Sequence, residues 1–399
     1  MTVDSVPRPV ELPKGGASWL YNARVRSIVY QVVLVAVVGF LVYEATTNAI
    51  ENLRRANIAS GFGFLERTAG FSINFKLIDY SETSTYGRAF LVGLLNTLLV
   101  SALGIVIATI LGFLIGIARL SNNFVVAKLA GGYVELIRNL PLLLQLVFWY
   151  TAVLQPLPNP RNGIALPGSI FLSNRGLVMP RPIFGDGFEY VVIGLFVGIA
   201  AAVFYYVRAR KKQEATGQQS PVFLVGAGLV LGIPLAVFLL LGSPLSFDVP
   251  SLQGFNYRGG MPLYPEFVAL LLGLSTYTAA FIAEIVRAGV AAVSHGQREA
   301  AYSLGLRPGV TLRLVVIPQA MRIIIPPLTS QYLNLTKNSS LAVAIGYPDL
   351  VQIFAGTVLN QTGQAVEVIA ITMAVYLTIS LITSAFMNWY NAHVALVER

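Results

Sequence analysis

The stretch EAAYSLGLRPGVTLRLVVIPQA, from Glu299 to Ala320, is a polar segment that lies between two long apolar runs. Its start suits a short helix over Gln297 to Leu304, and Gly305 suits the end of that helix because glycine tolerates the left-handed backbone found there. Arg307 to Gly309 predict a turn, after which Val310 begins a second helix. The segment is therefore predicted to be a helix-turn-helix.

The apolar runs around this segment are those of a membrane protein. Charged residues make up 11% of the chain and hydrophobic residues 55%, whereas a soluble domain carries about 25% charged residues. A soluble protein with a large core is disfavoured because uncharged runs exceed the ~18 residues that mark a spanning helix. The pattern predicts an all-helical integral membrane protein with spans at about Ile28 to Ala45, Phe90 to Ile117, Gly131 to Leu154, Tyr190 to Val207, Val222 to Leu241, Phe267 to Val286, Ile323 to Ile345 and Val368 to Tyr390.

Positive charge in short loops orients these eight spans. The densest cluster is RARKK, Arg208 to Lys212, so the loop between the fourth and fifth spans is predicted to be cytoplasmic. By alternation, the Glu299 segment and both termini share that side. The first span follows Arg24 and Arg26 as a signal peptide would, but its length and the lack of a small-residue cleavage site favour a retained helix.

Two long loops lie on the opposite, outer side, at about Asn48 to Arg88 and Gln155 to Glu189. Their glycine, proline and asparagine content predicts irregular, packed structure rather than a separate domain. The sequence contains no G-x-x-x-x-G-K-[ST] phosphate loop. We therefore do not expect this chain to hydrolyse ATP by that route.

Two further classes of site are disfavoured by composition. With no cysteine and two histidines, the chain is expected to hold neither a disulfide nor a metal site. The net charge of +9 could suggest nucleic acid, but lysine and arginine fall mainly in short segments between apolar runs, without interleaved aromatic residues. We expect no nucleic-acid partner and interpret the excess as an orientation signal.

The Glu299 segment resembles a known signature. Glu299, Ala300 and Ala301 are followed after three residues by Gly305, and nine residues later by VVIP. This is similar to the EAA motif in the membrane subunits of bacterial ABC importers. The flanking stretches YTAAFIAEIVRAGV and PPLTSQYLNLTKNSSLAVAIGYPDL resemble the branch for polar and general L-amino acids, and the resemblance covers about Phe90 to the C-terminus.

The resemblance implies a permease subunit of the bacterial inner membrane that is not itself an enzyme. ATP and Mg would be bound by a partner ATPase, with no cofactor on this chain. The other implied partners are a second permease subunit, expected to be a homologous but different chain, a periplasmic amino-acid-binding protein, the L-amino-acid substrate and membrane lipids. Spans two, three, six, seven and eight would form a five-helix core.

The same resemblance divides the chain and assigns a role to the opening stretch. Residues 1–89 would hold a cytoplasmic tail, the first span and an outer loop, and residues 90–399 the transport domain, with an inserted loop and helix hairpin at about 155–245. The EAA loop, at about 291–320, would form a coupling helix that seats in the ATPase. Alanines give that helix a low-relief surface for a partner's groove, although the pattern alone also fits an ordinary interfacial loop. The coupling residues implied are Glu299, Ala300, Ala301, Gly305, Arg307 and Pro318.

Polar residues inside the seventh span suggest a substrate site. Pro326 and Pro327 remove two backbone donors and are expected to kink or unwind the helix unless neighbours satisfy the freed carbonyls. Beyond them, Gln331, Asn334 and Asn338 lie three and seven residues apart, which places them on one face. Uncharged amides offer both donors and acceptors to a zwitterion. The alternative is hydrogen bonding between helices.

The identity of these side chains bears on the substrate. Related permeases for strongly cationic amino acids carry carboxylates at positions matching Gln331 and Asn338, and amides here imply a broader or neutral and polar range. Thr278 in the sixth span is a weaker candidate for the same cavity.

Charged residues within the spans are expected to be paired. An unpaired Lys337 would cost about 2.5 to 3.5 kcal/mol on insertion scales, so we expect it to have a partner. Glu284 and Arg287, and likewise Glu135 and Arg138, are spaced three residues apart and can form ion pairs. We interpret these pairs as structural or gating elements rather than substrate contacts.

The sequence thus predicts an ABC importer permease for L-amino acids, and two rivals differ from it in class. A secondary transporter coupled to protons or sodium would show inverted repeats and an ion site of its own, and neither is visible in the sequence. A membrane scaffold or receptor would leave the polar, proline-containing seventh span unexplained.

Overall fold

The computed structural model describes residues 23–55 and 61–394, and the structure is mostly helical over that part of the chain. The predicted cytoplasmic termini, residues 1–22 and 395–399, lie outside the described residues. The helices are α1 Ala23–Arg55, α2 Tyr86–Arg119, α3 Phe124–Asn139, α4 Leu142–Val147, α5 Phe188–Thr216, α6 Val222–Leu240, α7 Pro265–Ala291, α8 His295–Ser303, α9 Pro308–Thr311, α10 Ile317–Asn338, α11 Leu359–Thr362 and α12 Ala365–Val394.

Helix α7 lies at the centre of the core. It packs against α2, α3, α4 and α10, and α10 in turn packs against α12. These helices correspond to the five spans that were predicted to form the core. Among the described residues there are seven helices long and apolar enough to cross a membrane, or eight if the bent pair of α3 and α4 with its extension counts as one span.

The contact between α2 and α7 is close because α2 presents glycines to it. A Cβ atom on Gly112 would lie 2.5 Å from a side-chain atom of Ile282, and one on Gly116 would lie 2.7 Å from Val286. No side chain larger than hydrogen fits at either position without a shift of one helix. Small residues allow such close backbone approach in membrane helices, where dispersion contacts replace the hydrophobic driving force.

The third predicted span, Gly131 to Leu154, is broken. Helix α3 ends at Asn139, and the segment Leu142–Leu154 leaves it at 108°. Leu140 and Pro141 between them have extended backbones, with ψ of 133° at both residues. The physical reason is that the residue before a proline is disfavoured in the helical region, and the proline itself has no amide hydrogen to donate.

The seventh span, by contrast, keeps its helix through the two prolines. Pro326 and Pro327 lie inside the continuous helix α10, and both are exposed. The expected unwinding at this point does not occur, because neighbouring Ile325 and Leu328 are buried in the core and hold the helix in place. Irregular geometry is found instead at the two ends of α10, in the π-helical turn Leu312–Val316 and the 3-10 turn Ser339–Ile345.

The second long loop contains strands that the sequence analysis did not predict. A four-stranded sheet has the order β1-β2-β3-β8, and two separate pairs join β4 with β5 and β6 with β7. Strand β3 precedes the α5–α6 hairpin and β8 follows it, so this sheet joins segments from both sides of the hairpin. The strands are β1 Ile164–Leu166, β2 Ile170–Ser173, β3 Gly176–Met179, β4 Arg181–Phe184, β5 Leu245–Asp248, β6 Ser251–Gln253, β7 Asn256–Arg258 and β8 Met261–Leu263.

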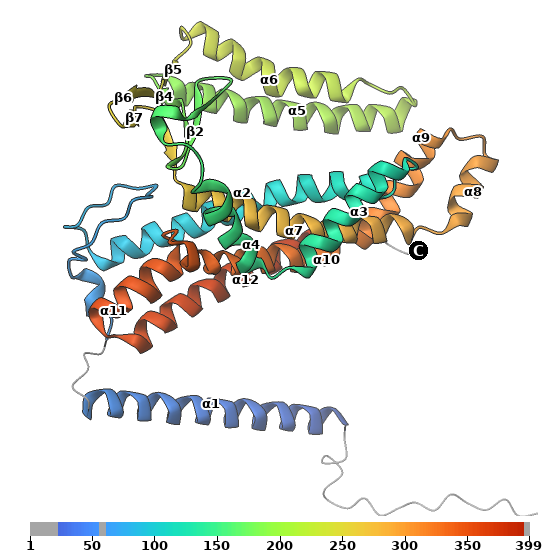
Figure 1. Cartoon of the computed structure of the whole chain (residues 1–399). Coiled ribbons are helices and arrows are strands. Elements are labelled where there is room, and N and C mark those ends of the chain that lie inside the picture. Colours follow the sequence, from blue (N-terminus) through green and yellow to red (C-terminus); the bar gives the residue numbers. More distant parts are fainter. Residues whose placement is uncertain (1–22, 56–60, 395–399) are drawn as a thin grey trace, which may run out of the picture.

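Two additions flank the core. Figure 1 shows α1 on one side of it and the α5–α6 hairpin on the other, with α5 and α6 packed mainly against each other. No residue of the α6 window that passes as a membrane span is buried, nor of the α1 window. Both additions therefore present apolar surface to surroundings other than this chain.

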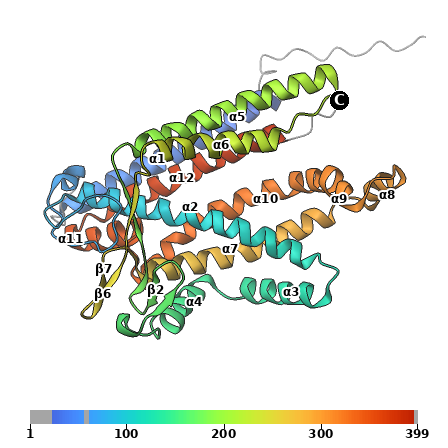
Figure 2. The ribbon, with the colours of Figure 1, turned by 90° about the horizontal axis from the view of Figure 1, so that it is seen from above.

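The molecule has two distinct ends. Helices α8 and α9, the tip of the α5–α6 hairpin and the link from α2 to α3 lie at one end, which we call the coupling end (Figures 1 and 2). The strands and α11 lie at the other end, which we call the strand end. The Glu299 segment and the inserted strands are thus separated by the length of the spans.

Candidate functional site

The Glu299 segment, which the sequence predicts to be a coupling element, is a short helix that ends in a defined turn. Helix α8 closes through hydrogen bonds from the amide of Gly305 to the carbonyl of Tyr302, at 2.9 Å, and from Leu306 to Ala301, at 3.1 Å. Gly305 has a φ of +74°. This pair of bonds around a left-handed glycine is the Schellman motif, which explains why glycine is needed at this position.

The exposed surface of α8 differs from the one expected. Ala300 is exposed, but Ala301 is only 4% exposed and packs inward. Ala301 therefore supports the helix instead of forming part of a docking surface. The glutamate of the motif points outward, where Glu299 Oε1 lies 3.0 Å from His295 Nδ1.

Two polar contacts tie α8 to neighbouring spans. Arg298 Nη2 donates to the carbonyl of Val290 at the end of α7, at 3.2 Å, and Gln319 Nε2 in α10 donates to Gln297 Oε1, at 3.3 Å. The predicted coupling residues Arg307 and Pro318 flank this arrangement as the residue before α9 and the second residue of α10, respectively. A displacement of α8 is thus linked to two different spans.

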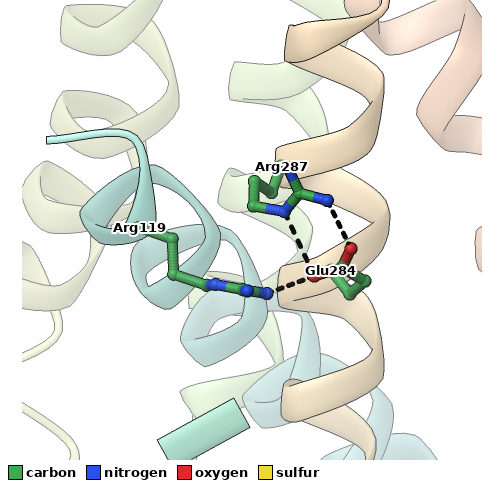
Figure 3. Close-up of polar contacts among 3 residues, drawn as sticks. All are labelled: Arg119, Glu284 and Arg287. Atoms are coloured by element: carbon green, nitrogen blue, oxygen red, sulfur yellow. Dashed lines mark hydrogen bonds and ion pairs between the residues drawn. The ribbon is translucent and has the colours of Figure 1, made fainter. Parts of the chain in front are cut away.

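An ion cluster joins α2 to α7 near the coupling end (Figure 3). Glu284 Oε1 accepts from Arg287 Nη2 at 2.6 Å, and Glu284 Oε2 accepts from Arg287 Nε at 3.2 Å and from Arg119 Nη1. The pairing of Glu284 with Arg287 was expected from their spacing. Arg119 adds a link between helices that the spacing could not reveal.

The other predicted pair does not form. Arg138 lies over the ring of Phe281, 5.1 Å from its centroid, and no ion pair joins it to Glu135 within the described part of the chain. The guanidinium of Arg138 makes a cation–π contact with Phe281 of α7, which an ion pair with Glu135 on its own helix would not provide. Glu135 instead lines a hollow of about 460 Å³ together with Arg119, Lys128 and Arg287.

The amide face of α10, formed by Gln331, Asn334 and Asn338, is accessible. Asn334 is exposed, and Gln331 and Asn338 are partly so. The hydrogen bonds of the described residues include none from these three side chains to any other part of the chain. Hydrogen bonding to another helix of this chain, the alternative explanation for the amides, is therefore not seen.

Two further predicted residues lie elsewhere. Thr278 is 3% exposed in α7, so its burial removes it from any accessible cavity. Lys337 is exposed, and its side chain has no partner among the residues described, contrary to the expectation that it would be paired. Because its side chain lies on the surface of this chain, the ammonium group of Lys337 is open to a partner from outside the chain.

Comparison with known proteins identifies the family. Residues 217–396 match the model for the binding-protein-dependent transport system inner membrane component. The chain is 54% identical to the general L-amino acid transport system permease protein AapQ of Rhizobium johnstonii, over 97% of this chain and 98% of that protein. It is 55% identical to the putative amino-acid ABC transporter permease protein YhdX of Escherichia coli, again over 97% of this chain and 98% of the other.

The chain belongs to this family of ABC transporter permeases. A third relative is the glutamate/glutamine/aspartate/asparagine transport system permease protein BztB of Rhodobacter capsulatus, at 42% identity over 97% of this chain and 98% of the relative. The permease is accordingly a multi-pass inner-membrane subunit without catalytic activity of its own. As the membrane component of such a system it works with an ATPase, which binds ATP, and with a binding protein.

The structure draws attention to permease residues that the sequence analysis missed. Leu304, at the end of α8, is 80% exposed, and Tyr302 beside it is 50% exposed. Large apolar side chains in an otherwise polar segment are a signal that could have been used, because such residues serve as anchors in protein interfaces. Arg119 gave no such signal, since its partner Glu284 is 165 positions away in the sequence.

Proposed function

We propose that this permease imports L-amino acids of broad or polar range, and that the amide face of α10 contacts the substrate. The substrate class rests on one observation. Over 97% of its length the chain aligns with a permease named for general L-amino acid transport. The accessible, uncharged amides support it, because amides accept and donate hydrogen bonds without selecting one sign of charge. Lys337 and the ion cluster are structural or gating elements in this proposal.

The coupling end is the cytoplasmic end. Positive charge gathers near this end: Arg119 ends α2, Lys128 lies in α3, the Arg208–Lys212 cluster lies near the end of α5, and Arg307 precedes α9. This agrees with the excess of positive charge near the cytoplasmic ends of spans. Helix α8 then seats in the ATPase, and closure of the ATPase pair moves α7 and α10 as rigid bodies between inward-open and outward-open states. The two termini lie on the same side.

The subunit composition tests this function directly. We expect the purified complex to contain an ATPase and a second permease, a homologous but different chain, and to take up labelled amino acids only with ATP and the binding protein. Mass spectrometry identifies the chains, and uptake into proteoliposomes measures the activity. Transport by the lone chain without ATP would contradict the proposal.

The role of the amide face is tested by Asn338→Asp. The change keeps the size of the side chain and adds a carboxylate, so uptake should shift toward arginine or lysine and away from glutamate. The shift in relative transport is expected to be about 5- to 150-fold, corresponding to ~1 to 3 kcal/mol for a charged hydrogen bond. Competition uptake with acidic, neutral and basic amino acids measures it, provided that the binding protein accepts all three.

An Asn122→Asp variant serves as the matched control, because Asn122 is an exposed amide in the link between α2 and α3. Its preference order should equal that of the unaltered transporter. An unchanged order in the Asn338→Asp transporter at several pH values, with transport intact, would show that Asn338 does not face the substrate.

A further inference from the structure

A second polar cavity, separate from the amide face, lies at the strand end of the permease. Its volume is about 660 Å³. Its walls come from the segment before α2, the π-helical turn Phe148–Leu154, strands of the insert, the start of α7 and the turn after Ile345. None of the residues predicted from the sequence lines it.

Two opposite charges face this cavity from different walls. Arg175 lies in the turn between β2 and β3, and Glu266 lies in the first turn of α7. In the described part of the chain neither residue forms an ion pair. The structure therefore places around one cavity a guanidinium and a carboxylate that have no oppositely charged partner among the described residues, so each can meet the opposite charge of a ligand.

The position of Glu266 is fixed by a neighbour. Its Oε1 accepts a hydrogen bond from the hydroxyl of Tyr150 at 2.9 Å. The second carboxylate oxygen has no such partner in the described residues and can accept from a ligand. The start of α7 is held in turn by Phe267, whose ring stacks on Phe75 at 5.1 Å between centroids.

The remaining lining is mixed. Amides from three different walls contribute Asn174, Asn256 and Gln352, and aromatic rings contribute Phe75 and Tyr347. The Oδ1 atom of Asn174 is buried and has no hydrogen-bond partner among the described residues. Such a lining accommodates both polar and apolar side chains of a small ligand.

We infer that this cavity binds the free L-amino acid zwitterion before it reaches the amide face. Arg175 holds the α-carboxylate, since a guanidinium matches a carboxylate with two parallel hydrogen bonds. Glu266 holds the α-ammonium group. Both anchors recognise the part that all amino acids share, and the mixed walls leave the side chain free to vary.

This inference rests on the proposed function, because it assumes that the strand end faces the outside and that the cargo is an amino acid. The insert would then have a role in transport. Strands β3 and β8 pair directly above the start of α7, with Leu177 opposite Leu263. They hold the turn that carries Arg175 against the core that carries Glu266.

The test uses the complete transporter in lipid nanodiscs without its binding protein. Equilibrium binding of radiolabelled L-glutamine is measured in a Gln331→Ala, Asn334→Ala, Asn338→Ala background, in which the amide face no longer contributes. Arg175→Gln and Glu266→Gln should each weaken binding by about tenfold or more, the range expected for loss of one charged hydrogen bond. The glutamine at 266 can still accept from Tyr150, so only the charge is lost.

Matched controls come from the same end of the molecule. Arg258→Gln removes an exposed arginine of β7 that does not line the cavity, and Glu189→Gln removes a glutamate from the first turn of α5. Both should bind L-glutamine like the parent. Blocked ligands add a second criterion. Glutaminamide, which lacks the α-carboxylate, should be rejected by the parent but not by Arg175→Gln. N-acetylglutamine, which lacks the α-ammonium group, should be rejected by the parent but not by Glu266→Gln.

The possible outcomes separate the two proposals. A transporter that takes up amino acids, while both cavity variants bind like the controls, overturns the cavity site alone. A transporter that takes up no amino acid overturns the proposed function. Cavity variants that bind L-glutamine normally but no longer capture the binding protein overturn the inference in favour of a docking surface.

Discussion

At the scale of single residues, Asp349 shows how burial sets the properties of a side chain at the strand end. It is fully buried between the turn after α10 and the π-helical turn Val351–Val358. Its Oδ1 accepts from the amide of Gln352 at 2.8 Å, and Oδ2 accepts from the hydroxyl of Tyr376 at 3.3 Å. Burial nevertheless dominates and raises the pKa of Asp349 to about 7.

This raised pKa predicts a pH-dependent effect of Asp349→Asn. The native state binds the proton more tightly than the unfolded state, so Asp349 contributes stability below its unfolded pKa of about 4, and that contribution is lost as the pH rises through about 7. Asparagine does not titrate. The melting temperature of Asp349→Asn relative to the parent should therefore rise between pH 5 and pH 8.

Thermal unfolding of the purified complex in detergent measures this difference. Asp349→Ala is the control: it does not titrate either, so its difference from the parent should follow the same pH dependence, but it loses the acceptors for Gln352 and Tyr376 and should be about 1 to 3 kcal/mol less stable than Asp349→Asn at every pH. A difference between Asp349→Asn and the parent that stays constant with pH would show that Asp349 remains ionised when buried.

At the scale of elements, the α5–α6 hairpin behaves as a unit of its own. Its two helices pack through Gly198, where a Cβ atom would lie 2.6 Å from the carbonyl oxygen of Leu229. The tip, which follows the basic cluster Arg208–Lys212, lies at the coupling end and apart from α8 (Figure 1). The tip is thus expected to matter less than the packing between the helices.

Replacing residues 213–219 by a short glycine-serine linker should leave uptake within about twofold of the parent, since exposed tips tolerate such changes. Gly198→Leu should instead lower the amount of protein in the membrane, because α5 and α6 can no longer approach each other. Uptake and immunoblots of membrane fractions check both. Loss of uptake in the linker variant at normal protein levels would show that the tip takes part in the mechanism.

How far the sequence predicts these elements depends on the range of the interactions. The long apolar runs, the turn at Gly305 and the polar face of α10 depend on local pattern and were predicted. The break at Pro141 was not predicted, although a proline inside a span is a local signal for such a break. Strands of three or four residues that pair across an inserted hairpin, and the contact of Arg119 with Glu284, depend on tertiary packing, which local sequence does not encode.

At the scale of the whole molecule, transport requires that an event at the coupling end reaches the spans. The proposed function divides this into two separate steps: docking of the ATPase on α8, and transmission from α8 to α7 and α10. We assign Leu304 to the first step because its side chain, at the end of α8, is 80% exposed. Arg298 belongs to the second because its side chain reaches back to the carbonyl of Val290.

The two steps predict two different defects. Leu304→Ser should weaken capture of the ATPase by about tenfold or more, the value of one buried leucine at an interface, and uptake should fall with it. Arg298→Met should retain the ATPase but reduce uptake, because α8 loses its hydrogen bond to the end of α7. Co-purification and uptake are measured on the same membranes, with Phe255→Ser, an exposed residue at the strand end, as the control. Arg298→Met could instead lose the ATPase as completely as Leu304→Ser. Docking and transmission would then depend on the same surface, and α8 would be a docking element without a separate link to the spans.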